Sequence, residues 1–505
     1  MKQLNKVLIG LTLIFFSSCG DILNQMPEVV VTSKNVWSSE YDAQKVFNAM
    51  NNEVRNGAKT AQYWLMGEVR AREFSICTDY VRQNIYYNTL YLSTGQGDFN
   101  WAPYYKCIAL SNLLIENLKT VPIEQERKNY LLASSYFVRA FNYFVILRNW
   151  REAPLILTSD ELNQGRKATA LQLFDQIIAD TKNAELLMAG HSWNEAIALS
   201  GIGIASKQMV SAGTIDALLA HVYAWHGSLT KNQDILKESV KYASKVIANS
   251  EYILATTPEE VCTKVMYGNS GEGIYEADFT TSETMGMAIP AYYLIGYPVV
   301  KNALPGGIRL WPYASYQLNN PFVEAVFDEV GDQRKTSYFY KFDEMKSTYG
   351  PTNGNRPYFQ KWRTPIYTND GNKTYTGMDA NFIFFRLSDI YLLRAEIENR
   401  LGNAESARLD LNIIRQRAGL NQYMASVNGD LKLAILKERR RELFMEGQRF
   451  YDLIRNDELR NQVSTFKDMS ETDVREGCYY LPVNAAAFTK NPAMRQNIYW
   501  KRNGY

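Results

Sequence analysis

The stretch FIFFRLSDIYLLRAEIENRLGNAESARLDLNIIRQRAGL (382–420), followed by LKLAILKERRRELFMEGQRFYDLIR (431–455), decides the fold. Its apolar residues recur at helical spacing in two successive stripes. The first contains Ile390, Leu393, Ile397 and Leu401, and the second Ala404, Ala407, Leu411, Ile414 and Ala418. Gly402-Asn403 separates the stripes as a helix C-cap does, and Gly419 ends the second. Two helices of similar length joined by so short a turn pack antiparallel, as in a helical repeat.

A third helix is predicted for 431–455, with Glu438, Glu442 and Glu446 along one face and arginines between them. Two carboxylates at this spacing could be imagined as the acid/base pair of a glycosidase. The neighbouring arginines, however, would keep the carboxylates ionised, which suits ion pairs and spoils a general acid. We therefore interpret this face as part of the scaffold.

These segments resemble the SusD/RagB family of bacterial surface lipoproteins. The matching motifs are RLSDIYLLRAE (386–396), LNIIRQRAGL (411–420) and ERRRELFMEGQRFYDLIR (438–455), in the family's order. CGDILNQMPE, from Cys19, and LPVNAAAFTKNPAMRQN (481–497) are also similar to family segments. The last residues depart from the family, because IYWKR (498–502) precedes Asn503-Gly504-Tyr505 where Pro-Gly-Tyr is more usual. The resemblance implies a tetratricopeptide-like scaffold, although no clean 34-residue repeat is visible.

The amino terminus has the features of a lipoprotein signal peptide, residues 1–18. Lys2 and Lys6 precede a short apolar run, Val7 to Phe16, and small residues lead to Cys19. This run is too short to span a bilayer, for which ~20 residues are needed. We expect Cys19 to become an acylated amino terminus that anchors the protein to the outer membrane, facing outward; cleavage to a free secreted product is the alternative. We find no later run long and apolar enough to cross a membrane.

The composition indicates an exported protein that folds as one domain. Removing Lys2 and Lys6 takes the basic count from 55 to 53, against 53 acidic residues. A neutral chain argues against nucleic-acid partners, which require a basic excess. No linker divides the sequence, so residues 19–505 are predicted to form a single domain. Cys77, Cys107, Cys262 and Cys478 could form two disulfides or remain thiols.

The predicted fold is mainly α, with irregular insertions and short strands. The helical scaffold is assigned to 39–56, 101–250 and 387–455. Two segments, 60–100 and 250–382, are rich in Gly, Asn and aromatic residues and are predicted to be ligand-binding insertions. Within or beside the second, GIYEADF (273–279) and NFIFFR (381–386) read as strands.

Ligand contacts are predicted in these insertions, because an aromatic ring matches the C–H face of a sugar and polar side chains match its hydroxyls. TDYVRQNIYYN (78–88) and AYYLIGYPVVKNALPGGIRLWPY (291–313) offer both kinds of side chain. The predicted contacts are Trp64, Asp79, Tyr80, Arg82, Asn84, Tyr292, Arg309, Trp311 and Tyr313. The resemblance implies an aromatic arc in comparable regions but assigns none of these positions.

The sequence offers little catalytic or metal-binding chemistry. His221 and His226 are five residues apart, which does not match the i, i+4 spacing of a zinc helix, so we interpret them as core or surface residues. GIGIAS (201–206) lacks the third glycine of a dinucleotide site and is interpreted as a turn. We predict no catalytic residue, no metal and no cofactor.

Three functions remain open. The first is a surface lipoprotein that binds oligosaccharide and passes it to a SusC-like, TonB-dependent outer-membrane barrel, the partner that the resemblance implies. The second is a peptide-binding lipoprotein on the same scaffold, as the RagB side of the family suggests. The third is a hydrolase of surface polymers, although spacing identifies no acid/base pair. We predict the first, a protein that is not an enzyme.

Overall fold

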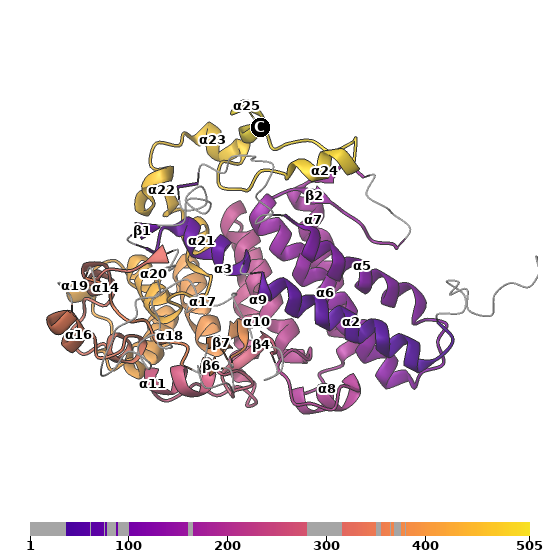
Figure 1. The fold of residues 1–505 in the computed structure, drawn as a ribbon, viewed down its shortest axis with the longest axis horizontal. Coiled ribbons are helices and arrows are strands. Elements are labelled where there is room, and N and C mark those ends of the chain that lie inside the picture. The colour runs from indigo at the N-terminus through magenta and orange to yellow at the C-terminus, as the bar shows by residue number, and fades with distance from the viewer. Residues whose placement is uncertain are drawn as a thin grey trace, which may run out of the picture.

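The computed structural model describes most of the chain between residues 37 and 504. The described ranges are 37–60, 62–74, 76–77, 87–88, 100–159, 165–279, 316–349, 355–363, 365–367, 375–378 and 380–504. Helices dominate, as predicted, and they pack in sequence order into one continuous array (Figure 1). The long helices are α2 (Glu40–Lys59), α5 (Ala102–Asn117), α6 (Gln125–Trp150), α7 (Ala170–Met188), α9 (Ala212–Thr230), α10 (Gln233–Ala248), α17 (Leu387–Arg400), α18 (Ala404–Arg417) and α20 (Leu431–Glu442).

Each long helix packs on the next one: α2 on α5, α5 on α6, α6 on α7, α7 on α9, α9 on α10, α10 on α17, and α17 on both α18 and α20. Local signals set the boundaries. Ser39 and Thr169 cap α2 and α7 through reciprocal hydrogen bonds with the third residue of each helix. Gly402, with φ +87°, turns the chain between α17 and α18. The α17–α18 pair is therefore the one that the sequence predicts.

Short elements fill the remaining described chain. The short helices are α3 (Gln62–Gly67), η1 (Val69–Ala71), α8 (Trp193–Ser200), α11 (Pro258–Glu260), η2 (Val261–Val265), α14 (Asn320–Val326), α15 (Gln333–Tyr338), α16 (Phe342–Tyr349), α19 (Ala425–Asn428), α21 (Arg449–Arg455), α22 (Leu459–Gln462), η4 (Ser464–Phe466), α23 (Glu471–Glu476), α24 (Ala485–Lys490) and α25 (Ile498–Arg502). The strands are β1 (Ile76–Cys77), β2 (Ala153–Pro154), β3 (Lys167–Ala168), β4 (Gly273–Ala277), β5 (Tyr316–Gln317), β6 (Pro365–Tyr367), β7 (Tyr375–Met378) and β8 (Phe382–Arg386). They form two-stranded antiparallel pairs, β1–β5, β2–β3, β4–β8 and β6–β7.

The two strands predicted from GIYEADF and NFIFFR pair with each other as β4 and β8, and both are buried along their length. Their aromatic side chains continue the core of the helical array: the Tyr275 and Phe384 rings stack at 5.2 Å, and both contact Phe141 of α6. This sheet joins the first half of the array to α17.

Helix α6 corrects one expectation. By length and composition it could cross a membrane, whereas the sequence analysis found no such run after Cys19. Most of its apolar stretch, 89%, is buried inside the protein. Its apolar character is therefore explained by its place at the centre of the array, where α5 and α7 cover it.

The third predicted helix is interrupted. α20 ends at Glu442 and α21 starts at Arg449. Between them Met445 and Gly447 take positive φ, +66° and +81°, which no continuing helix allows. Glu446 therefore does not share a helix face with Glu438 and Glu442.

The C-terminal segment returns to the first third of the chain, so that α24 lies beside β2 (Figure 1). Trp150 Nε1 donates to the Pro482 carbonyl at 3.2 Å, and Asn491 Nδ2 donates to the Gly165 carbonyl at 2.9 Å. Gln496 exchanges two hydrogen bonds with the Val483 backbone, at 2.8 and 3.1 Å. This part of the closing sequence motif is thus a fixed wall against the helical array.

Glu276 on β4 makes the free energy of unfolding of the protein depend on pH. Burial raises its pKa to about 7, although its Oε2 accepts hydrogen bonds from Asn381 Nδ2 and the Asn269 backbone, both at 2.8 Å. Because the folded pKa exceeds the ordinary Glu value of 4.5, the folded state holds the proton more tightly. This contribution is complete below pH 4.5 and is lost as the pH rises through 7, at a cost on the order of 3 kcal/mol.

Glu276→Gln should remove that dependence, because an amide cannot ionise and its oxygen can still accept both hydrogen bonds. Urea unfolding of the two proteins at pH 5 and pH 8 measures it. We expect the variant to gain stability relative to wild type at pH 8 and to lose that advantage at pH 5. An equal difference at both pH values would contradict the assignment.

Candidate functional site

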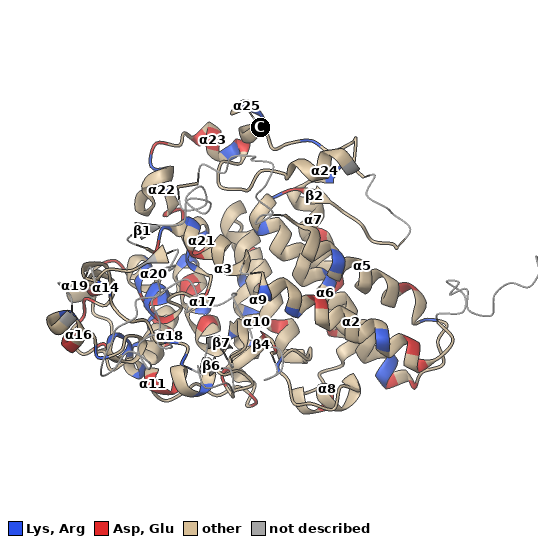
Figure 2. Cartoon of the chain, in the orientation of Figure 1, with Lys and Arg blue, Asp and Glu red and all other residues tan. Residues whose placement is uncertain are grey.

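Glu438, Glu442 and Glu446 belong to a buried network of ion pairs. Figure 2 shows acidic and basic positions close together on the ribbon around α17 and α20. At its centre is Arg386, the last residue of β8, whose guanidinium contacts three carboxylates. Its nitrogens lie 2.6 Å from Glu272 Oε1, 2.9 Å from Glu442 Oε1 and 2.7 Å from Glu446 Oε1. The interpretation of these glutamates as part of the scaffold is confirmed. Glu446 reaches the network from the turn between α20 and α21, and not from the helix face that carries Glu438 and Glu442.

Further arginines complete the network. Arg417 bridges Glu272 at 2.7 Å and Glu442 at 2.5 Å, and Arg334 lies 2.7 Å from Glu438. Burial alone would raise the pKa of Glu442, but these arginines and Arg386 hold it well below the ordinary value. Glu442 is ionised at neutral pH, so it cannot serve as a general acid.

The histidines on α9 are core residues, one of the two roles predicted for them. His221 Nε2 lies 2.8 Å from Asp389 Oδ2, and its ring stacks on Phe385 at 4.8 Å. His226 stacks on Phe174 at 4.1 Å. Within the described ranges, no group of three or more His, Cys, Asp or Glu side chains is placed to hold a metal ion. Gly201 and Gly203 have positive φ and form the predicted turn after α8.

Trp64, on α3, is the one predicted ligand contact among the described residues, and the structure places it in the core. The side chain is fully buried, and its ring packs edge-on against Phe74 at 5.5 Å and Tyr316 at 5.6 Å. A ring enclosed in this way offers no face to a ligand arriving from solvent, so packing explains Trp64 better than binding. The other predicted contacts lie outside the described residues: Asp79, Tyr80, Arg82, Asn84, Tyr292, Arg309, Trp311 and Tyr313.

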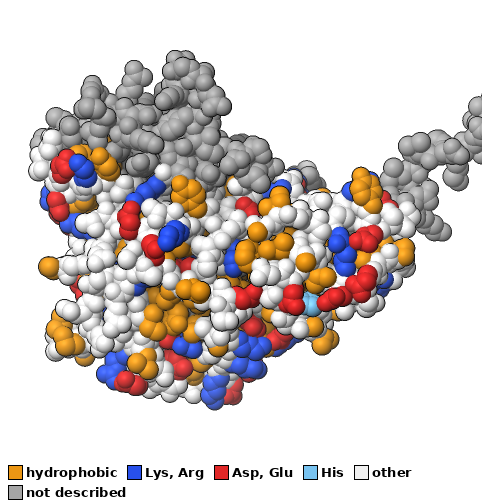
Figure 3. Space-filling view, turned by 90° about the horizontal axis from the view of Figure 1, so that it is seen from below, with side chains coloured by type: hydrophobic (Ala, Val, Ile, Leu, Met, Phe, Trp, Pro, Cys, Tyr) orange, Lys and Arg blue, Asp and Glu red, His pale blue; other side chains and the backbone are white. Residues whose placement is uncertain are grey.

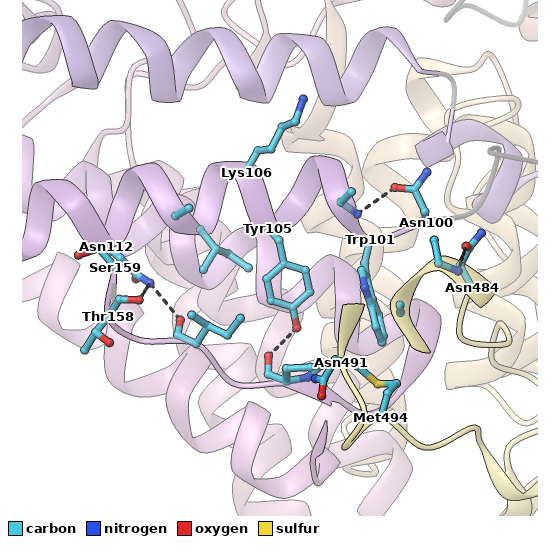
Figure 4. Close-up of a pocket in the computed structure, with 17 residues that line it drawn as sticks. Asn100, Trp101, Tyr105, Lys106, Asn112, Thr158, Ser159, Asn484, Asn491 and Met494 are labelled. Carbon is cyan, nitrogen blue, oxygen red and sulfur yellow. Dashed lines mark hydrogen bonds between the residues drawn. The ribbon is translucent and has the colours of Figure 1, made fainter. Parts of the chain in front are cut away.

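A cavity of about 540 Å³ lies between α5 and the C-terminal segment, and we name it the α5–α24 pocket (Figure 4). This volume falls in the range of small-molecule sites, ~300–1,000 Å³. Its lining residues come from one face of α5, from the chain after β2 and from the region of α24. They are Asn100, Trp101, Ala102, Tyr105, Lys106, Ile108, Ala109, Asn112, Pro154, Ile156, Thr158, Ser159, Asn484, Ala486, Ala487, Asn491 and Met494.

Two aromatic rings form one wall of the pocket. Trp101 and Tyr105 are four residues apart, so they lie on the same side of the start of α5. Their centroids are 5.9 Å apart and their planes meet at 80°, which makes a corner. The Tyr105 hydroxyl donates to the Pro154 carbonyl at 2.5 Å, and Trp101 packs on Trp150 at 5.8 Å. Both rings are therefore held in place.

Amide and hydroxyl groups line the opposite end of the pocket. Asn112 is buried, and its Nδ2 donates to the Ile156 and Thr158 carbonyls at 3.2 and 3.3 Å. Arg139 donates to the Asn112 amide oxygen at 2.9 Å and is itself bound to Asp180 at 2.7 and 2.8 Å. This buried chain of contacts fixes the backbone that carries Thr158.

Sequence reasoning missed this pocket. Tyr105 fits the apolar pattern of its helix, which predicts packing only, and Trp101 stands at the boundary between an insertion and a helix. A usable signal was the pair of aromatic residues at i, i+4 on a helix start. Nothing local, however, indicates that a segment almost 390 residues later covers them.

Two family comparisons match separate parts of the chain. The model described as "SusD family" matches residues 327–500, and the model described as "Starch-binding associating with outer membrane" matches residues 23–199. The second stretch contains the aromatic wall of the pocket, and the first contains α24. The chain belongs to the SusD/RagB family.

Other members of the SusD/RagB family are similar over nearly the whole length. The SusD-like protein P38 of Formosa agariphila is 24% identical, and the match covers 97% of both chains. A crystallised SusD homolog from Bacteroides thetaiotaomicron gives a TM-score of 0.75 at 21% identity, covering 92% of this chain and 98% of that one. A laminarin-binding SusD-like protein gives 0.71 at 20% identity, covering 93% and 100%. These likenesses show that the fold is the tetratricopeptide-like array of SusD-like structures.

Proposed function

We propose that this protein is a non-catalytic, cell-surface lipoprotein that binds oligosaccharide or polysaccharide. It passes the glycan to a SusC-like, TonB-dependent outer-membrane barrel. The observation that carries the proposal is family membership together with a fold shared with a laminarin-binding protein over 93% of the chain. The insertions at 60–100 and 250–382 remain the proposed ligand surface.

The charge of the described surface supports a neutral ligand. On the face shown in Figure 3, basic and acidic side chains are interspersed with apolar ones. The chain carries 55 basic and 53 acidic residues in total. A polymer of neutral sugars needs no clustered charge for its recognition. Aromatic rings contact the C–H faces of the sugars, and uncharged hydrogen-bonding groups contact their hydroxyls.

Glycan binding is tested by titration calorimetry of the protein without its leader. The panel contains β-1,3-gluco-oligosaccharides, malto-oligosaccharides and mixed plant and host glycans. We expect saturable binding of at least one glycan class and no release of new reducing ends. A folded protein that binds none of them would overturn the proposal, and binding of peptides alone would favour the peptide alternative.

Anchoring through Cys19 predicts a change of cell fraction. Cys19→Ala removes the thiol that acylation requires, so in cells that lack the proposed partner barrel the variant should leave the membrane fraction. Fractionation and immunoblotting measure the distribution, with Cys478→Ala as the control that keeps Cys19. Cys478 is buried and unbonded, which makes it unsuitable as an anchor. Retention of the Cys19 variant in the membrane would disprove acyl anchoring.

A further inference from the structure

We propose that the α5–α24 pocket is a saccharide subsite that uses none of the nine residues predicted as ligand contacts. This inference rests on the proposed function and adds a location to it. The subsite seats one or two uncharged sugar rings at the corner between Trp101 and Tyr105. Its second wall comes from α24.

The aromatic corner supplies the contact for the ring faces. A pyranose presents axial C–H groups that pack against a flat aromatic surface. Because the Trp101 and Tyr105 planes meet at 80°, one ring can contact the face of a sugar while the other contacts its side. Alanine and methionine side chains, Ala109, Ala487 and Met494, complete an apolar lining.

The pocket is built before any ligand arrives. Tyr105 is tethered by its hydroxyl to the Pro154 carbonyl, and Trp101 is packed on Trp150, which is itself bonded to Pro482. Ordering a side chain on binding costs ~0.5–1.5 kcal/mol, and rings held in advance avoid this cost. The opposite wall is equally fixed, because Asn491 is bonded to Gly165 across the pocket edge.

The lining selects an uncharged ligand. Among the described residues that line it, Lys106 is the only charged one, and Figure 4 shows its side chain pointing away from the Trp101 and Tyr105 rings. The other polar lining side chains are amides and hydroxyls. The amides of Asn112 and Asn491 are bonded to backbone groups, and Asn484 Oδ1 accepts a hydrogen bond from the Ala486 backbone at 2.9 Å. The Thr158 hydroxyl and Asn484 Nδ2 lie at the pocket edge, where sugar hydroxyls can reach them. Within the described lining, no cation points at the aromatic corner to receive a phosphate or a nucleic acid.

Filling the pocket tests the subsite without removing the rings that support the core. Ala487→Phe places a benzyl group in the cavity from α24. Ala485→Phe is the matched control, because Ala485 lies on the same short helix, is exposed and does not line the pocket. Ala109→Phe fills the cavity from the α5 wall and provides an independent second variant. Thermal unfolding of all three variants verifies that they are folded.

The probes are laminaritriose and maltotriose, titrated by calorimetry into wild type and each variant. For the trisaccharide that binds wild type, we expect Ala487→Phe and Ala109→Phe to weaken binding by about tenfold or more, and Ala485→Phe to change it less than twofold. If the folded filled variants bind as wild type does, the subsite is wrong and the proposed function stands. If no protein, wild type included, binds these or any other glycan, the proposed function fails and the subsite with it.

Discussion

Replacing Glu442 with glutamine is expected to lower the free energy of unfolding by about 3–5 kcal/mol, the usual cost of breaking a buried ion pair. The carboxylate contacts both Arg386 and Arg417, and all three side chains are almost completely buried. Glutamine keeps the shape but removes the charge, so Arg417 would retain only Glu272 among these contacts. Urea unfolding followed by circular dichroism measures the change.

The matched control is Glu405→Gln on α18, where Glu405 pairs with Arg408 at the surface. That pair is exposed and screened by water, so its loss should change stability very little. Acid should reproduce the Glu442 effect in wild type. Since the network lowers the pKa of this carboxyl, its contribution is present above the ordinary Glu pKa and is lost as the pH falls through the folded value. A Glu442 variant as stable as the Glu405 variant would show that the network contributes nothing net.

Gly67→Ala is expected to be the most disruptive glycine substitution in this part of the fold. A Cβ built on Gly67 would lie 1.8 Å from the carbonyl oxygen of Gly447, a backbone atom that no side-chain rotation can move away. The two backbones are held together there, because Gly447 N donates to Glu68 Oε1 at 2.8 Å. Overpacking costs ~1–3 kcal/mol and sometimes more, so we expect a loss at the upper end of that range.

Gly57→Ala is the control for this prediction. Gly57 lies in the last turns of α2, and its added Cβ would meet only Tyr63, at 3.8 Å, which is ordinary contact. Alanine favours a helix over glycine by up to ~1 kcal/mol, so this variant should be slightly more stable than wild type. Thermal unfolding of both variants under one condition compares them. An unchanged melting temperature for Gly67→Ala would mean that α3 can shift away from residue 447 without cost.

The helices were predictable because their signals are local. Spaced apolar residues and caps such as Ser39 and Gly402 place α2, α17 and α18 within a few residues of their observed bounds. The break between α20 and α21 was not predictable in this way. It is stabilised by contacts far along the chain, since Glu446 turns out of the helix to reach Arg386 and Lys361. The spacing of apolar residues along a helix carries no information about such a distant partner.

The candidate site was less accessible to sequence reasoning. The aromatic residues of the irregular segments predict a ligand contact at Trp64. The fold instead encloses this ring between Phe74 and Tyr316. The helical pattern around Trp101 and Tyr105 is ordinary, so it predicts packing and not a binding site. Whether an aromatic ring lines a cavity depends on what packs opposite to it, and here that is α24 and the chain that follows it.

The buried ion pairs also constrain the order in which the protein can be made. Glu272 leaves the ribosome long before Arg386, and Arg386 before Arg417 and Glu442, yet the four side chains are buried together as ion pairs. A nascent chain that stops short of residue 442 would have to strip water from arginines that lack part of their counter-charge, so it gains by staying open. We therefore expect this half of the array to collapse only after residue 442 has been made, a useful property for a polypeptide whose leader predicts export.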